Sequence, residues 1–324
     1  MGSRPEPVYA GATSFLRRRY SRDLVAESPD VVVSGIPYDL GTTNRPGARF
    51  GPRAIREASA NLAFGRVWPW NLDPFETLSV IDWGDVVFDE GYPDRMVEAV
   101  EAHADRIIAT GARMLTLGGD HFVTLPLLRA HARKHGPVAL VHLDAHSDAW
   151  RDERHNHGSM FFHAVEEGLV DASRSVQIGL RTFNEEDHGY TILTAPWVHE
   201  HGPGAVAEEI RRVVGSHTTY LTIDIDCLDP AYAPGTGTPV VGGLTTSQVQ
   251  RVVYALAGAP EPSFVGMDVV EVSPPYDAAG ITSLAAATLA LEWICLLACR
   301  LQGLGAPNAA QGGSGRVSAG RALR

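Results

Sequence analysis

Short apolar runs alternate with longer segments along most of the chain. The runs are rich in Val, Ile and Leu, which is typical of strands buried on both faces of a parallel sheet. The longer segments carry apolar residues at the three- and four-residue spacing of amphipathic helices. We expect strands at 31–36, 78–81, 114–117, 138–143, 176–180, 220–225 and 264–269, and a weaker strand near Trp197 and Val198. We expect helices at 94–110, 124–134 and 246–256.

This alternation predicts the fold class. A chain that switches repeatedly between strand and helix builds a sheet of parallel strands with helices on both faces. We therefore expect a three-layer α/β/α domain over residues 31–301, with a mostly parallel central sheet of roughly eight strands. Residues 1–30 form an N-terminal arm in this interpretation. We predict a disordered tail at 302–324, because this segment is rich in glycine and lacks acidic residues.

The composition is that of an ordinary globular protein and narrows the function. The 324 residues are 44% hydrophobic and 20% charged, and the net charge of −11 disfavours a nucleic-acid binder. Three cysteines exclude a disulfide framework and a cysteine-rich zinc module. The apolar stretch 284–301 contains Glu292 and Arg300, so we interpret it as a buried helix and expect no membrane span. The N-terminus lacks the apolar region of a secretory signal, so we expect a cytoplasmic protein.

Acidic residues and histidines follow four of the predicted strands. These segments are Gly118-Gly119-Asp120-His121, Asp144-Ala145-His146-Ser147-Asp148, Asp224-Ile225-Asp226 and Glu271. The carboxyl ends of parallel strands lie on one edge of a sheet, where ligands bind in open α/β folds. If the strands are parallel, the four segments therefore converge in space.

The spacing within these segments favours a metal site. Residues two apart in an extended chain point to the same side, so the segments present a set of candidate ligands together. The candidate ligands are His121, Asp144, His146, Asp148, Asp224 and Asp226. Four carboxylates this close require counter-charge, which two divalent cations would supply. Oxygen and imidazole ligands without a thiolate favour Mn²⁺, while iron, cobalt and catalytic zinc stay open.

The same segments resemble the signatures of the arginase, or ureohydrolase, family. The resemblance rests on Gly-Gly-Asp-His (118–121), Asp-Ala-His-Ser-Asp (144–148) and Asp-Ile-Asp-Cys-Leu-Asp-Pro (224–230), and covers nearly all of 31–300. Within the family, the chain most resembles bacterial agmatinases. This narrower match is carried by 121–130, by His157-Gly158-Ser159-Met160-Phe161-Phe162 and by 265–272.

The resemblance implies an arginase-like fold and two Mn²⁺ ions per subunit. His121 and Asp148 would bind one ion, His146 and Asp226 would bind the other, and Asp144 and Asp224 would bridge them. His157 matches a histidine that passes a proton to the leaving amine, and Glu271 matches a carboxylate that binds the guanidinium group. Asp120 would lie behind the ligands and orient one of them. The resemblance also implies a homo-oligomer, either a trimer or a hexamer.

The implied reaction is the hydrolysis of agmatine, a small cationic guanidino substrate, to urea and putrescine for polyamine biosynthesis. Two divalent cations can lower the pKa of a shared water, and His157 has a suitable side chain for protonating the leaving amine. His155, two residues away, is a competing candidate for that role. A guanidinobutyrase or another ureohydrolase is the nearest alternative, with a substrate that carries a carboxylate in place of the distal ammonium group. Arg151 and Arg154 would favour that carboxylate, but Asp152 and Glu153 in the same loop leave the local charge undecided.

Two alternatives come from other classes of protein. A metal-dependent acetylpolyamine deacetylase has a related fold, but one catalytic zinc ion suffices for it, and six candidate ligands exceed that need. A non-catalytic family member that binds a partner is disfavoured because all six candidate ligands are present. We expect His142 and His163 to be packed or solvent-facing side chains, and we assign no role to Gln177 or Arg181.

Overall fold

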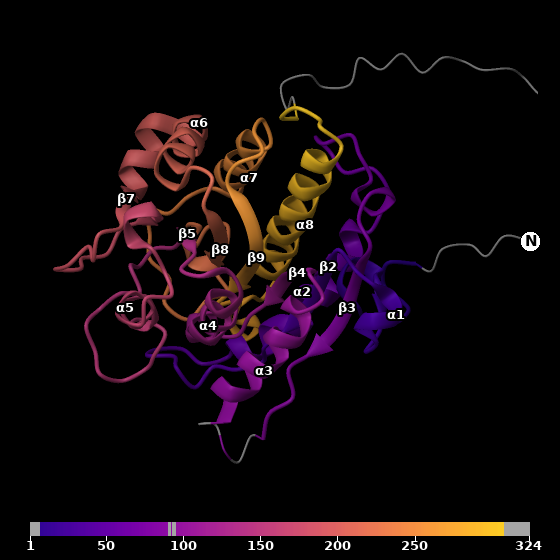
Figure 1. Ribbon diagram of the computed structural model, residues 1–324, viewed down its shortest axis with the longest axis horizontal. Helices are drawn as coiled ribbons and strands as arrows, with labels where there is room; N and C mark the ends of the chain where they lie inside the picture. Colours follow the sequence, from indigo (N-terminus) through magenta and orange to yellow (C-terminus); the bar gives the residue numbers. More distant parts are fainter. Residues whose placement is uncertain (1–6, 90–91, 93–94, 308–324) are drawn as a thin grey trace, which may run out of the picture.

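The computed structural model describes residues 7–89, 92 and 95–307, and in these residues nine parallel strands form one sheet (Figure 1). The strand order is β1-β3-β2-β4-β9-β8-β5-β6-β7. In chain order the strands are β1 (Arg19–Tyr20), β2 (Val31–Gly35), β3 (Val80–Asp85), β4 (Arg113–Leu117), β5 (Ala139–Leu143), β6 (Val176–Leu180), β7 (Thr191–Thr194), β8 (Thr218–Asp224) and β9 (Ser263–Val270). The predicted class of a parallel α/β sheet is confirmed.

Eight α-helices are present in the described residues, and the longer ones cover the two faces of the sheet (Figure 1). They are α1 (Leu24–Glu27), α2 (Gly51–Ser59), α3 (Met96–Ile108), α4 (Thr124–His135), α5 (Met160–Glu166), α6 (Ala195–Val214), α7 (Thr246–Leu256) and α8 (Ile281–Leu301). Side chains of α3, α4 and α5 belong to one buried apolar cluster, and those of α2, α6, α7 and α8 belong to the other.

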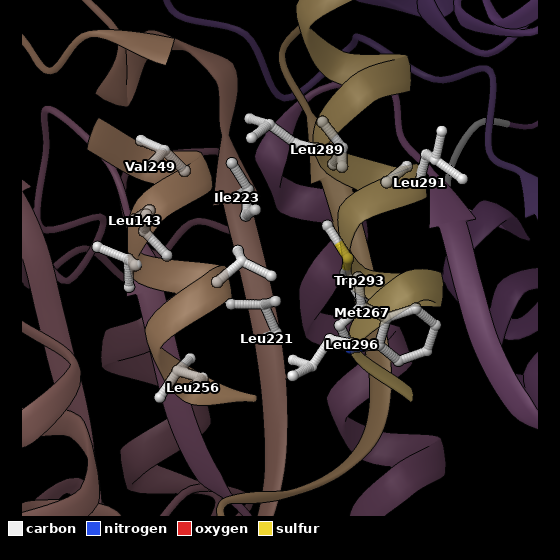
Figure 2. Packing of buried hydrophobic residues seen from close by; sticks show 14 of the residues in the cluster. Leu143, Leu221, Ile223, Val249, Leu256, Met267, Leu289, Leu291, Trp293 and Leu296 are labelled. Carbon is white, nitrogen blue, oxygen red and sulfur yellow. The ribbon is translucent and has the colours of Figure 1, made fainter. Parts of the chain in front are cut away.

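The two clusters form because successive residues of a strand point to opposite faces. In β2, Val31 and Val33 join the cluster that includes α8, while Val32 joins the one that includes α3. Figure 2 shows the first cluster close up, with labelled side chains from the strands packed against labelled side chains from α7 and α8. From the strands these are Leu143, Leu221, Ile223 and Met267, and from the helices Val249, Leu256, Leu289, Leu291, Trp293 and Leu296.

The weaker strand expected near Trp197 and Val198 is wrong. Both residues lie in the first turn of α6, and the strand in this region is β7, which ends at Thr194. The Thr194 side chain accepts a hydrogen bond from the Trp197 backbone N–H, and Pro196 occupies the first turn. A threonine cap followed by proline is a strong helix start, and it prevails over the strand preference of two apolar residues.

The helix α8 is the apolar stretch that we interpreted as a buried helix. It is long and apolar enough to cross a membrane by length and composition alone, but 83% of its apolar window is buried inside the protein. Its Trp293, Ile294 and Leu296 are completely buried. The interpretation as a core helix is therefore confirmed.

The chain ends differ in how much of them is described. In the N-terminal segment, β1 pairs with β3, and Phe15 and Leu16 are fully buried in the first cluster. This segment is therefore packed onto the sheet from about residue 15 onward. The predicted disorder of 302–324 falls largely on residues outside the described part of the chain, which ends at 307.

The strands that precede the acidic segments are consecutive in the sheet. The order β4-β9-β8-β5 places the ends of these four strands side by side. In chain order, β4 leads through α4 to β5, yet β9 and β8 lie between β4 and β5. Such a change in strand order opens a crevice at the carboxyl edge of a parallel sheet, which is where ligands bind in this class of fold.

Candidate metal centre and cavity

The structure brings the six candidate ligands together at this edge. Asp144 follows β5, Asp224 ends β8, and His121 starts the short 3₁₀ helix His121–Val123 after β4. Asp226 lies in the 3₁₀ helix Ile225–Cys227 after β8. The turns hold one another in place, because the Asp226 carboxylate accepts a hydrogen bond from the Ala145 N–H at 3.1 Å.

One group of candidate ligands surrounds His121. Its Nδ1 lies 2.9 Å from Asp148 Oδ2, 3.1 Å from Asp144 Oδ2 and 3.3 Å from Asp224 Oδ2. All four side chains are nearly inaccessible to solvent. Three carboxylate oxygens and one imidazole nitrogen therefore point at a common centre.

A second group surrounds His146. Its Nδ1 lies 3.3 Å from Asp144 Oδ1 and 3.2 Å from Asp226 Oδ2. Asp144 belongs to both groups, with one carboxylate oxygen facing each histidine. Two overlapping sets have the spacing of metal ligands, namely His121, His142, Asp144 and Asp148, and Asp144, His146 and Asp226. Asp144 belongs to both, as expected for a carboxylate placed between two ions.

The hydrogen bonds of His121 leave its Nδ1 available as a ligand. Thr222 Oγ1 donates its proton to Asp268 Oδ1 at 2.5 Å, so it accepts a hydrogen bond from the His121 Nε2–H at 2.8 Å. This places the proton on Nε2 and the lone pair on Nδ1. Among the described residues, the buried Nδ1 has no hydrogen-bond partner, although three carboxylate oxygens lie within 3.3 Å. A nitrogen lone pair aimed among carboxylates fits a metal ion well.

The charges of the cluster also fit bound cations. Burial, together with the neighbouring Asp144, raises the pKa of Asp148 to about 7. Burial, Asp226 and Asp144 raise the pKa of Asp224 well above its ordinary value. Among the described residues, none of the four carboxylates forms an ion pair with an arginine or lysine. The described groups next to these carboxylates that can carry positive charge are imidazoles, which outweigh the effect of burial and lower the pKa of Asp144. Imidazoles bind a metal only when they are neutral, so in a metal site the bound cations would supply the compensating charge.

A third imidazole, that of His142, also lies against Asp144, although we expected His142 to be packed or solvent-facing. Its Nε2 lies 2.7 Å from Asp144 Oδ2, and its Nδ1 accepts a hydrogen bond from Gln177 Nε2 at 3.1 Å. Burial lowers the pKa of His142 to about 4, so the ring is neutral and donates its Nε2 proton to Asp144. His142 is two residues before Asp144 on the same face of β5, and this spacing was the signal available in the sequence.

His157 and Glu271 form a buried pair beside the cluster. His157 Nδ1 lies 2.8 Å from Glu271 Oε1, which also accepts a hydrogen bond from the His121 N–H. Glu271 Oε2 is buried without a hydrogen-bond partner in the described structure. Glu271 and Asp148 both have positive φ, at 62° and 49°. Non-glycine residues are strained in this region, and such strain is common where a side chain must be aimed.

The protonation of His157 depends on the surrounding charge. The Thr43 N–H donates to its Nε2 at 2.9 Å, which requires a neutral ring. Burial lowers the pKa of His157, but Glu271 and the nearby aspartates outweigh it and raise the pKa to about 9. Divalent cations beside these carboxylates would offset their charge and return the pKa of His157 toward neutrality.

The remaining predicted residues lie around this pair. Asp120 is fully buried, and its Oδ2 accepts a hydrogen bond from the Gly41 N–H at 2.7 Å. The Gly41 carbonyl in turn accepts from the His157 N–H at 3.2 Å, so Asp120 supports the loop that holds His157. His155 stacks on Phe122 and does not line the cavity described next, unlike His157.

A cavity of about 280 Å³ opens onto the cluster. His146, Asp148, Asp224 and His157 are among its buried or nearly buried walls. Trp150, Asp152, Arg154 and Asn156 from the loop after Asp148 line it as well, with Thr43 and Thr238. Glu271 is separated from this cavity and reaches it through His157. A substrate of modest size can therefore approach the candidate metal centre directly.

The chain belongs to the arginase family, whose model matches residues 29–295. It is 53% identical to an agmatinase from Chromobacterium violaceum, over 91% of this chain and 92% of that protein. The fold is similar to the crystal structure of a hypothetical agmatinase from Burkholderia thailandensis, with a TM-score of 0.89 and 52% identity over 93% of this chain and 95% of that one. It is also similar to Trypanosoma cruzi formiminoglutamase with Mn²⁺, with a TM-score of 0.76 and 25% identity over 84% and 94% of the two chains.

Family membership and the local geometry agree on the class of site. The two groups that share Asp144 have the form of the binuclear metal site of this family. The chain is therefore a member of the arginase family with the residues for a binuclear metal site.

Proposed function

We propose that this protein is an agmatinase, which hydrolyses agmatine to urea and putrescine in polyamine biosynthesis. The observation that carries the proposal is the pair of ligand groups joined by Asp144 at the base of a cavity that also contains His157. The choice of agmatine within the family is supported by the 53% identity to the agmatinase of C. violaceum.

We assign the metal site to two Mn²⁺ ions. In this proposal His121 and Asp148 would hold one ion, His146 and Asp226 would hold the other, and Asp144 and Asp224 would be shared by both. The oxygen-rich ligand set supports Mn²⁺, as does the Mn²⁺ in the related T. cruzi enzyme. Two bound divalent cations would offset the buried carboxylates and lower the pKa of water, so that hydroxide is supplied near neutral pH.

His157 and Glu271 act on the substrate in this proposal. Water adds its oxygen to the guanidinium carbon, the bond from that carbon to the substituted nitrogen breaks, and the leaving amine takes up a proton. His157 lines the cavity, takes up the proton that the attacking water loses and passes it to the leaving amine. Glu271 keeps His157 oriented through Oε1, and its unpartnered Oε2 accepts a hydrogen bond from a guanidinium group that reaches past His157 at the base of the cavity.

A second candidate within the family is a ureohydrolase whose substrate carries a distal carboxylate, such as guanidinobutyrate. The observation that favours it is Arg154, which lines the cavity and could pair with a carboxylate. The two candidates therefore differ in the charge at the end of the substrate away from the guanidinium group. Agmatine carries a positive ammonium group there, and guanidinobutyrate carries a negative carboxylate.

A urea-release assay tests the proposal directly. The protein is loaded with Mn²⁺ and assayed with agmatine, guanidinobutyrate and arginine under the same conditions. We expect agmatine to give the highest kcat/KM. Comparable values for all three substrates would contradict the substrate assignment while leaving the hydrolase class intact, and the absence of urea from every substrate would contradict the class.

We also propose a cytoplasmic homo-oligomer, either a trimer or a hexamer. Leu40, Phe50 and Val87 are exposed and line a surface cavity of about 460 Å³ on the described part of the chain. Exposed apolar residues gathered in one place are typical of surfaces that subunits cover. Light scattering after size-exclusion chromatography measures the number of subunits, and cell fractionation tests the location.

A further inference from the structure

The cavity changes character between its base and its mouth. The charged or titratable side chains at the base, such as His146, Asp148 and Asp224, are at most 15% exposed. At the other end, Asp152 is 27% exposed and Arg154 is 86% exposed. Because exposure rises along this direction, the reacting guanidinium group lies at the base and the far end of the substrate lies near Asp152 and Arg154.

These two residues are the charged side chains that line the mouth of the cavity. The neighbouring Arg151 pairs instead with Glu186, at 3.0 Å, and neither of these two residues lines the cavity. The charge that a substrate tail meets is therefore set by Asp152 and Arg154, which carry opposite signs.

Asp152 is held in place by the loop. Its Oδ1 accepts the Arg154 backbone N–H at 2.9 Å, and its Oδ2 accepts from Asn156 Nδ2 at 3.2 Å. The hydrogen bonds from Arg154 lower the pKa of Asp152, with the same direction of effect from Asn156, so the carboxylate is ionised at neutral pH. A carboxylate positioned by its own loop presents its negative charge in one place.

Arg154 is held much less firmly. Its guanidinium reaches Asp152 through Nε at 3.2 Å and Nη2 at 3.1 Å, and the rest of this long side chain is exposed. An exposed ion pair of this kind contributes little to stability, so Arg154 can leave Asp152 at small cost. A substrate ammonium can then take its place without moving the carboxylate.

A substrate carboxylate would face the reverse situation. It would have to bind the exposed Arg154 and draw it away from Asp152, which would leave two negative groups close together. Like charges near one another oppose binding. The charged side chain that is held in place at the mouth of the cavity is therefore Asp152, and its negative charge favours a substrate with a positively charged distal group.

We propose that Asp152 is the specificity residue that binds the distal ammonium group of the substrate, and that Arg154 is the counter-ion which this group displaces. This inference rests on the proposed agmatinase function and identifies the side chain that recognises the distal end of the substrate. Trp150, whose ring lies 6.2 Å from that of His146, provides an apolar wall for the methylene chain between the two charged ends.

The experiment compares Asp152→Asn with Glu153→Gln. The asparagine removes the charge and keeps one oxygen, which can accept the hydrogen bond from the Arg154 N–H but not also the one from Asn156 Nδ2. Glu153 offers the same charge change on the same loop outside the cavity lining. The substrates are agmatine and butylguanidine, which has the alkyl chain without the ammonium group. We expect Asp152→Asn to lower kcat/KM for agmatine about tenfold, mainly through KM, and to leave butylguanidine nearly unchanged. Glu153→Gln should change neither value.

A second variant tests the role of the counter-ion and does not depend on Asp152→Asn folding. Arg154→Gln frees Asp152, so we expect kcat/KM for agmatine to stay the same or rise up to about threefold at low salt. Equal losses on agmatine and butylguanidine in Asp152→Asn, or a tenfold loss on agmatine in Arg154→Gln, would overturn the inference. If wild-type enzyme released no urea from agmatine at all, the proposed function would fail, and the inference with it.

Discussion

Asp82 in β3 and Asp144 after β5 are equally inaccessible to solvent, but their surroundings differ. Asp82 faces Arg56, whose Nε and Nη2 donate to its two oxygens at 2.8 and 3.0 Å. The Phe15 and Gly84 N–H groups complete its hydrogen bonds. Asp144 has imidazoles and other carboxylates as neighbours, with no arginine or lysine among its described ion-pair partners.

The difference shows how buried charge reveals function. Burial of a charged group is costly unless another charge compensates it. Arg56 is the cation that compensates the buried charge of Asp82. This ion pair lies within the chain and contributes to the stability of the fold. At Asp144 the neighbouring groups that can carry positive charge are imidazoles, which bind metal ions only when they are neutral. The same burial therefore favours a metal site, in which bound cations supply the compensating charge.

The largest effect is expected for Asp144→Asn, which removes the carboxylate shared by both ligand groups. We expect the variant to retain less than two equivalents of metal and to lose urea release by about 10³-fold or more, because metal ions contribute several kcal/mol to such reactions. Elemental analysis and the urea assay measure the two effects. Asp105→Asn, at an exposed carboxylate paired with Arg133, is the control and should alter neither. Full metal content in Asp144→Asn would contradict the bridging assignment.

Arg56→Met removes the cation that pairs with the buried Asp82. This change leaves Asp82 buried without its cation, and we expect the free energy of unfolding to fall by about 3–5 kcal/mol. Arg133→Met removes a half-exposed arginine that pairs with Glu101 and Asp105, and should cost less than about 1 kcal/mol. Urea denaturation measures both. Similar values for the two variants would show that burial does not separate these ion pairs.

Glu271→Gln removes one buried carboxylate next to the ligand groups and preserves the shape of the side chain. We expect kcat/KM for agmatine to fall about 10²-fold, because the guanidinium group loses its anionic partner and His157 loses the charge that orients it. Metal content should stay at the wild-type level, as Glu271 is not among the candidate ligands. Unchanged turnover would contradict the role assigned to Glu271.

The smallest expected effect is on the pH dependence of stability and comes from His131, a buried histidine that is neutral in the folded protein. His131 in α4 is fully buried, and burial lowers its pKa to about 4, with His135 acting in the same direction and the Leu127 carbonyl opposing it. The ordinary pKa near 6.5 applies when the chain is unfolded, so the unfolded chain binds a proton first as the pH falls. His131 therefore lowers stability progressively between about pH 6.5 and 4, by on the order of 1–2 kcal/mol at pH 5.

His131→Gln should flatten this pH dependence, because glutamine does not titrate. The measurement is the free energy of unfolding of wild type and variant at pH 7 and pH 5, with the metal content held equal. Since other histidines titrate identically in both proteins, the difference between the two slopes isolates His131. An equally steep loss of stability in the variant would contradict the prediction.

Local patterns in the chain were sufficient to predict much of this protein. Alternating periodicities indicated a parallel α/β sheet, and the two-residue spacing in Asp144-Ala145-His146-Ser147-Asp148 indicated ligands on one side. Both are properties of residues near one another in sequence, so no long-range information was needed. The failed strand at Trp197 shows the limit, since an apolar pair is compatible with either element until the Thr194 cap is considered.

The tertiary structure decided which of these local features meet. The order β4-β9-β8-β5 brings His121 to Asp144 and Asp224, and strand order depends on packing between distant segments. The same packing turns His142 toward Asp144 and buries Asp82 against Arg56. The sequence shows which side chains can carry charge. Only the folded chain determines whether a buried charge pairs with another side chain of the protein or with an ion bound from solution.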